Sequence, residues 1–136
     1  MRDYMQFYIN GEWVDPVTPK SLDVIDPATE EVSGHINAGS EADVDKAVNA
    51  AAQAFKTWSR TSKEERLAIM NRIVEEFEKK VPELGEAITE EMGAPKWLAD
   101  GTQAAIGVNH FKTAISVLEK FEFEEDRGTS RIAREP

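Results

Sequence analysis

The chain has 136 residues, a length that suits one compact domain, and 40% of them are hydrophobic. The formal net charge is −10, which disfavours binding to nucleic acids and to anionic membranes. The sequence contains no cysteine, so disulfides, thiolate metal sites and a cysteine nucleophile are excluded within it. It also contains no apolar run of signal-peptide or membrane-spanning length, and we expect a cytoplasmic protein.

Short strands are predicted in the first third of the chain. Residues 7–9 and 12–14 flank an Asn-Gly pair. This pair tolerates the positive φ angles of a type I′ turn, so it predicts a β-hairpin. Residues 22–26 predict another strand, which a proline ends, and residues 31–37 predict the strand that pairs with it.

From Ser40 onward the apolar residues recur every three or four positions, as they do in amphipathic helices. Ser40 followed by Asp43, and Ser62 followed by Glu65, resemble capping boxes, in which the hydroxyl accepts a backbone N–H of the first turn. These two signals predict the starts of a first and a second helix.

Two further helices are predicted after the second. Pro82 suits the first turn of a third helix, because its missing N–H costs nothing there, and Gly93 suits its end. A fourth helix is predicted over residues 96–120. Gly101 and Gly107 interrupt its pattern, which indicates either close packing or a break at these positions.

The last residues alternate again. Phe121 and Phe123 are predicted on one side of a strand, with a turn at residues 127–130 and a returning strand at residues 131–134. The first of these strands would either pair with a partner chain or remain a plain surface strand. The expected fold class is α+β and mostly helical. It combines an N-terminal β-hairpin and strand pair, about four amphipathic helices, and a C-terminal β-hairpin arm.

Residues that could carry chemistry are few. The sequence has no glycine-rich phosphate loop and no hydrolase or metalloprotease motif, and His35 and His110 are typical of structural or surface histidines. Glu90 and Glu91 stand near the predicted end of the third helix, where the helix dipole disfavours carboxylates. Either they form a solvated helix end, or a nearby cation, lysine or arginine compensates their charge.

Six segments in order, together spanning essentially the whole chain, resemble the aldehyde dehydrogenase family. Asp26 stands where the family usually has asparagine, and Ala94 stands where lysine is common. The six segments are residues 7–14, 24–32, 42–58, 65–67, 89–95 and 131–136.

The resemblance implies a parent enzyme that oxidises an aldehyde to a carboxylic acid with NAD or NADP, through a thiohemiacetal on a cysteine. Residues 1–120 would form the N-terminal part of its cofactor-binding domain, and residues 121–136 the start of an oligomerisation arm. The nucleophile, the general base and the phosphate-binding glycines would all lie beyond Pro136. We therefore expect no catalytic or cofactor-binding residues here, no cofactor bound to this chain alone, and no activity of this chain alone.

The resemblance also implies a partial site for a monovalent cation, held by backbone oxygens of Val24 and Ile25 and by Glu91. It places Gln103 and Gly107 near the mouth of the substrate tunnel. The expected partner is the remainder of the enzyme or a further copy in a homo-oligomer. Two alternatives stay open: an interaction module that pairs with the rest of an enzyme or with an intact relative, and an independent helical protein that binds a small ligand.

Overall fold

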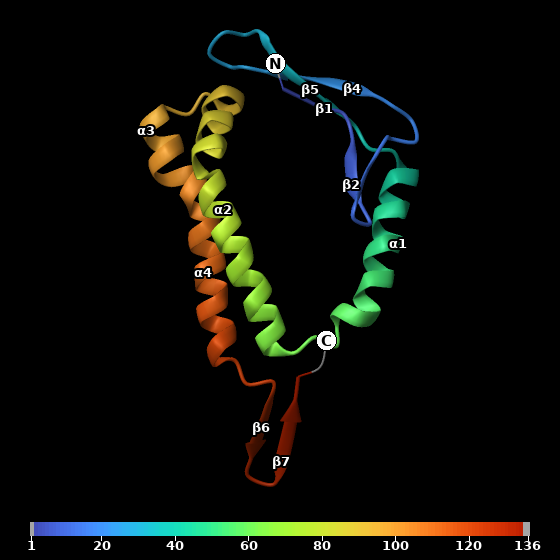
Figure 1. Ribbon diagram of the computed structural model, residues 1–136, viewed down its shortest axis with the longest axis vertical. Coiled ribbons are helices and arrows are strands. Elements are labelled where there is room, and N and C mark those ends of the chain that lie inside the picture. The colour runs from blue at the N-terminus through green and yellow to red at the C-terminus, as the bar shows by residue number, and fades with distance from the viewer. Residues whose placement is uncertain (1, 135–136) are drawn as a thin grey trace.

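The computed structural model describes residues 2–134, so the outermost residues of the two predicted domain ranges, 1, 135 and 136, lie outside it. A three-stranded sheet joins α1 on one side to the paired helices α2 and α4 on the other, and a hairpin projects from the far end (Figure 1). In chain order the elements are β1 (Arg2–Tyr4), β2 (Phe7–Ile9), β3 (Glu12–Val14), β4 (Ser21–Ile25), β5 (Val32–Asn37), α1 (Glu41–Trp58), α2 (Lys63–Met92), α3 (Lys96–Leu98), the π-helical segment η1 (Ala99–Gln103), α4 (Ala104–Lys120), β6 (Glu124–Arg127) and β7 (Ser130–Ala133). Among the described residues, no helix combines the length and the apolarity needed to cross a membrane.

The predicted hairpin and strand pair are confirmed. Asn10 and Gly11 have φ angles of 55° and 86°, as a type I′ turn requires, and they join β2 to β3. Antiparallel β4 and β5 form the second pair. A further strand, β1, was not predicted, and it pairs in parallel with β5.

Gly34 allows β1 to pair with β5 in this sheet. A Cβ atom at position 34 would collide with the backbone carbonyl of Arg2, which lies opposite Gly34 in the register of β1 and β5. Only glycine leaves room for so close a backbone approach. Because β1 has three residues and no apolar alternation, it carries no local signal of a strand.

Helix α1 begins at the predicted capping box. The Ser40 hydroxyl accepts from the Asp43 amide, and the Asp43 carboxylate accepts from the Ser40 amide at 2.9 Å. Asp43 also accepts from the Val17 amide and is only 4% exposed, so it ties the connection after β3 to the helix start. Beyond this point α1 contacts mainly β2, and its apolar face stays exposed.

The predicted boundary between a second and a third helix is wrong, because α2 runs without a break from Lys63 to Met92 with Pro82 inside it. A proline in a helix interior costs about 3 kcal/mol. Here the face of α2 packs against α4 through Phe77 and Val81 before the proline, and Gly85 is buried after it. This packing on both sides of Pro82 opposes a break.

The predicted fourth helix forms as one helical run, α3, η1 and α4. Close packing, one of the two effects expected of its glycines, occurs at Gly107, whereas at Gly101 the helix changes to π-helical geometry without a break. Gly101 lies within the π-helical segment η1, whereas Gly107 lies against the Phe77 ring of α2. At the junction before this run, Gly93 adopts a left-handed φ of 68° and ends α2 as predicted.

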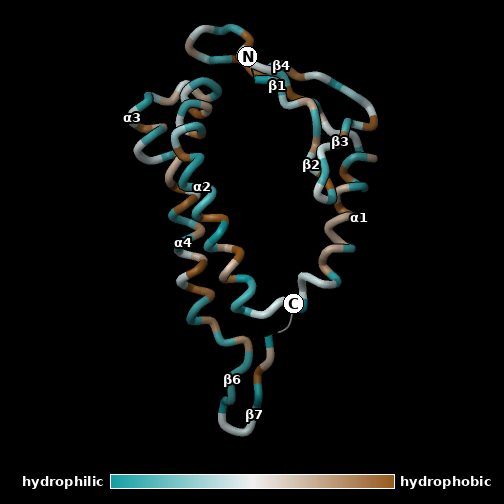
Figure 2. Tube along the Cα trace, in the orientation of Figure 1, coloured by the Kyte–Doolittle hydropathy of each residue, from teal (hydrophilic) through white to brown (hydrophobic). Residues whose placement is uncertain are grey.

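The core lies between α2 and α4. Val74, Val108 and Ile115 are buried there, and the rings of Phe77 and Phe111 meet edge to face with centroids 6.3 Å apart. Apolar residues also recur along α1, where no second helix of the described part of the chain covers them (Figure 2). The chain therefore buries one of its apolar helix faces and leaves another open.

The C-terminal hairpin is confirmed, with a shorter first strand than predicted. Phe121 and Phe123 precede β6 rather than belonging to it, and their rings meet edge to face at 4.9 Å. The Arg134 guanidinium lies 5.6 Å from the centre of the Phe121 ring and donates to the Glu122 carbonyl. These contacts fix the root of the arm beside the end of α4.

Candidate functional site

A cavity of about 240 Å³ lies between the three-stranded sheet and the end of α2. Val24 and Glu91 both line it, whereas Ile25 is not among its lining residues. The structure thus brings together two of the three residues that the resemblance assigns to a cation. Whether they bind an ion stays a prediction.

Local backbone features position this cavity. The register of β4 and β5 shifts between Val24, which pairs with Gly34, and Ile25, which pairs with Val32, so that Ser33 is an extra residue in β5 beside the cavity. At the end of α2, a Cβ atom on Gly93 would lie 2.9 Å from Cγ of Pro27. The turn that follows β4 therefore packs directly on the helix end, and this contact places Glu91 near the sheet.

Arg2 supplies a positive charge in the same cavity. Its Nη1 atom lies 3.4 Å from Oε2 of Glu90 and its Nη2 atom 3.9 Å from Oε2 of Glu86. The last turn of α2 contains no basic residue. Arg2 of β1 therefore provides the positively charged side chain that the helix dipole and the carboxylates favour. Arg2 is a site residue that sequence reasoning missed, because its strand was missed. In residues 2–134, no group of three or more His, Asp or Glu side chains is arranged to hold a metal ion.

Gln103 and Gly107 both lie on the helical run that packs against α2. Gln103 ends the π-helical segment, and its Oε1 atom is buried without a hydrogen-bond partner among the described residues, as are Thr89 Oγ1 and Asp100 Oδ1. Such π-helical segments are frequent at functional sites. The role of Gln103 and Gly107 at a tunnel mouth stays a prediction.

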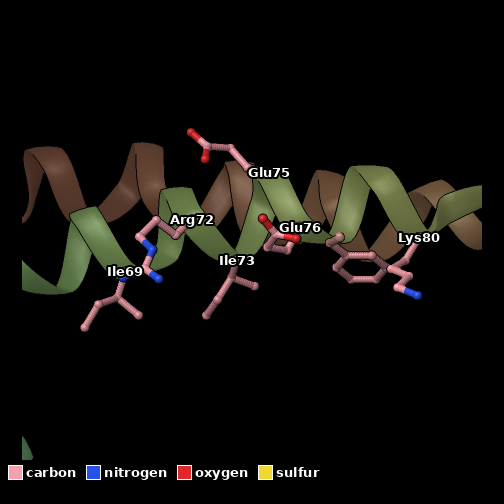
Figure 3. A pocket seen from close by; sticks show the side chains of 7 residues that line it. Ile69, Arg72, Ile73, Glu75, Glu76 and Lys80 are labelled. Carbon is pink, nitrogen blue, oxygen red and sulfur yellow. The ribbon is translucent and has the colours of Figure 1, made fainter.

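A surface hollow of about 650 Å³ runs along α2. Figure 3 shows Ile69 and Ile73 projecting on one side of the helix, whereas Glu75 projects on the other. At the rim, a hydrogen bond from Lys79 lowers the pKa of Glu76, so this carboxylate is held ionised. An apolar strip with charged edges suits packing against another surface rather than catalysis.

A hydrogen bond from Lys80 likewise lowers the pKa of Glu83 on α2, whereas two further carboxylates with lowered pKa serve helix starts. The side chain and then the amide of Ser40 lower the pKa of Asp43, and the amide and then the hydroxyl of Ser62 lower the pKa of Glu65. Both carboxylates act as caps.

Comparisons with known proteins identify the family of this chain. The family model for the aldehyde dehydrogenase family matches residues 13–136. A 3-succinoylsemialdehyde-pyridine dehydrogenase from a Pseudomonas species is 51% identical over 100% of this chain and 29% of its own length. A putative aldehyde dehydrogenase from Staphylococcus aureus is 45% identical over 99% of this chain and 28% of its own length.

Solved structures show the same partial coverage. An aldehyde dehydrogenase from Bartonella henselae superposes with a TM-score of 0.92 at 44% identity, covering 96% of this chain and 28% of that one. Aldehyde dehydrogenase C from Pseudomonas syringae, solved with NAD+ and octanal, gives a TM-score of 0.90 at 41% identity, with 93% and 26% covered. The fold, with one buried helix pair and one open helix face, is that of an N-terminal segment of a larger enzyme fold. The chain belongs to the aldehyde dehydrogenase family, and it spans about 28% of the length of these relatives.

Proposed function

We propose that this chain forms the N-terminal part of an NAD-dependent aldehyde dehydrogenase and supplies scaffold rather than reacting groups. The observation that carries the proposal is the match of the whole chain, at 51% identity, to 29% of a dehydrogenase. Residues 1–120 would belong to the cofactor-binding domain and residues 121–136 to the start of an oligomerisation arm. NAD is favoured over NADP because three of the similar structures were solved with NAD.

The chemistry of the parent enzyme needs a thiolate nucleophile, and this chain contains no cysteine. It also has no glycine-rich phosphate loop for NAD. We therefore assign no cofactor-binding residue and no step of the reaction to this chain. Its contribution would be to position the parts that react.

A chimera tests this proposal. The aligned N-terminal segment of the Pseudomonas relative is replaced by this chain, and reduction of NAD+ is followed with aldehyde substrates of that relative. We expect the chimera to oxidise aldehydes at a rate within about tenfold of the relative, and the isolated 136-residue chain to show none. The matched control is the same chimera with its nucleophilic cysteine replaced by alanine.

Two results would contradict the proposal. Cofactor reduction by the isolated chain above the no-protein background would show that it carries chemistry of its own. A soluble chimera without activity would show that the chain cannot serve as the N-terminal part of the enzyme.

An interaction module remains the second candidate, and the exposed face of α1 favours it. Val44, Val48 and Phe55 are 57%, 59% and 52% exposed on that face. Apolar patches of this kind mark surfaces that pack on a partner. Restoration of activity on mixing this chain with the separately expressed remainder of the relative would support this candidate, and no complex on size exclusion would contradict it.

A further inference from the structure

The cavity between the sheet and the end of α2 already contains a fixed positive charge. We propose that the Arg2 guanidinium takes the place that the family resemblance gives to a monovalent cation. The positive charge beside the carboxylates of the cavity then comes from a side chain of this protein and not from a bound ion. The proposal concerns the isolated chain, and it does not depend on the parent activity.

The first support is the position of the guanidinium. It contacts Glu90 and Glu86, one helical turn apart on the last turns of α2, and it lines the cavity together with Glu91. About a third of the Arg2 and Glu90 side chains is exposed, 32% and 33%, so this pair is shielded more than an ordinary surface pair. An arginine stays charged at any relevant pH, so the positive charge is permanent.

The second support is that the backbone holds Arg2 in this place. Its carbonyl lies over Gly34, where no Cβ atom intervenes, and the next residue, Asp3, contacts Nδ1 of His35 at 2.9 Å. These two contacts occur at consecutive pairs in the register of β1 and β5, Arg2 with Gly34 and Asp3 with His35. Pairing with β5 therefore fixes the backbone of Arg2, and its side chain reaches the carboxylates at the end of α2.

The third support is that the guanidinium opposes a second positive charge in the cavity. Val24 and Glu91 line the cavity together with Arg2. The Val24 carbonyl accepts from the Ser33 hydroxyl at 3.1 Å, which occupies only one of its two lone pairs. A sodium or potassium ion there would meet the repulsion of the guanidinium at close range.

The experiment compares Arg2→Gln with the unchanged chain by ²³Na NMR line width, with protein titrated into NaCl at constant ionic strength set by choline chloride. We expect no specific broadening for the unchanged chain. The Arg2→Gln variant should broaden the line with an affinity at least about tenfold higher, because a tenfold change corresponds to removing only about 1.4 kcal/mol of repulsion. Arg60→Gln, at an exposed arginine between α1 and α2, is the matched control and should behave as the unchanged chain.

Two further variants keep the test decisive. Arg2→Lys retains a positive charge and should show no broadening. Adding Glu91→Gln to Arg2→Gln should remove the broadening, because the ion would lose its carboxylate ligand. If Arg2→Gln is too unstable for titration, its melting temperature in NaCl is compared with that in choline chloride. A bound sodium ion would raise the melting temperature in NaCl only.

The proposal is overturned by any of three results: specific sodium binding by the unchanged chain, no gain in the Arg2→Gln variant, or a gain that survives loss of the Glu91 carboxylate. The first would mean that an ion and Arg2 share the cavity. The other two would mean that Arg2 does not stand in an ion's place.

Discussion

Replacing Gly107 by alanine tests the packing of α4 on α2. A Cβ atom at this position would lie 2.5 Å from Cζ and 2.7 Å from Cε1 of the Phe77 ring, well inside the usual carbon–carbon contact of about 3.5–4 Å. Overpacking of this kind costs about 1–3 kcal/mol, and the better helix propensity of alanine returns about 1 kcal/mol. We expect a net loss of about 1 kcal/mol, which lowers the melting temperature by about 3–6 °C in circular dichroism.

Gly101 provides the matched control on the same helical run, because nothing lies within 4 Å of a Cβ atom built there. Gly101→Ala should be neutral or stabilising by up to about 1 kcal/mol. A double-mutant cycle with Phe77→Leu isolates the contact, and we expect a coupling of about 1 kcal/mol between Gly107→Ala and Phe77→Leu. Equal melting temperatures for the two alanine variants, or additive effects in the cycle, would refute the reasoning.

Two further predictions concern the helix start and the open face. Ser62→Ala should cost about 1 kcal/mol in urea unfolding, because the first turn of α2 loses the hydroxyl of its cap. The Ser62 amide and hydroxyl lower the pKa of Glu65 below its ordinary value of 4.5. The stability from this carboxylate is therefore complete above pH 4.5 and lost as the pH falls through the lowered value. Glu65→Gln should thus reduce the loss of stability in acid, and an unchanged acid profile would count against this role. The isolated chain should sediment above its monomer mass of 15.2 kDa at tens of micromolar, because apolar patches associate. Val48→Glu with Phe55→Glu should restore the monomer whereas Gln53→Glu should not, and a monomeric unchanged chain would contradict this.

Signals read from neighbouring residues predicted the structure well. The turn at Asn10, the caps at Ser40 and Ser62, and the left-handed end at Gly93 each depend on a few consecutive residues, and each forms as predicted. Short-range hydrogen bonds decide these features, so a short stretch of sequence is enough to predict them.

Features decided by distant contacts were missed or misjudged. Pro82 favours a helix start locally, but packing of α2 on α4 keeps the helix continuous. Arg2 gives no signal alone, because its role depends on Gly34 in the sheet and on Glu90 in a helix. In the candidate site, the acidic end of α2 could therefore be predicted from the sequence. The strand that supplies the opposite charge could not.

The contrast between α1 and α2 shows what covers an apolar helix face in this chain. Both helices carry an apolar stripe. Within residues 2–134, α4 packs on the stripe of α2, whereas α1 contacts mainly β2 and no helix packs on its stripe. Full burial of one large apolar side chain contributes about 1.5–3 kcal/mol, and the exposed halves of Val44, Val48, Phe55 and Trp58 thus amount to several kcal/mol. This is comparable to the whole stability of a typical domain, about 5–15 kcal/mol. The stability of α1 should therefore depend strongly on whatever surface packs against it, which the proposed parent enzyme would provide from its remaining length.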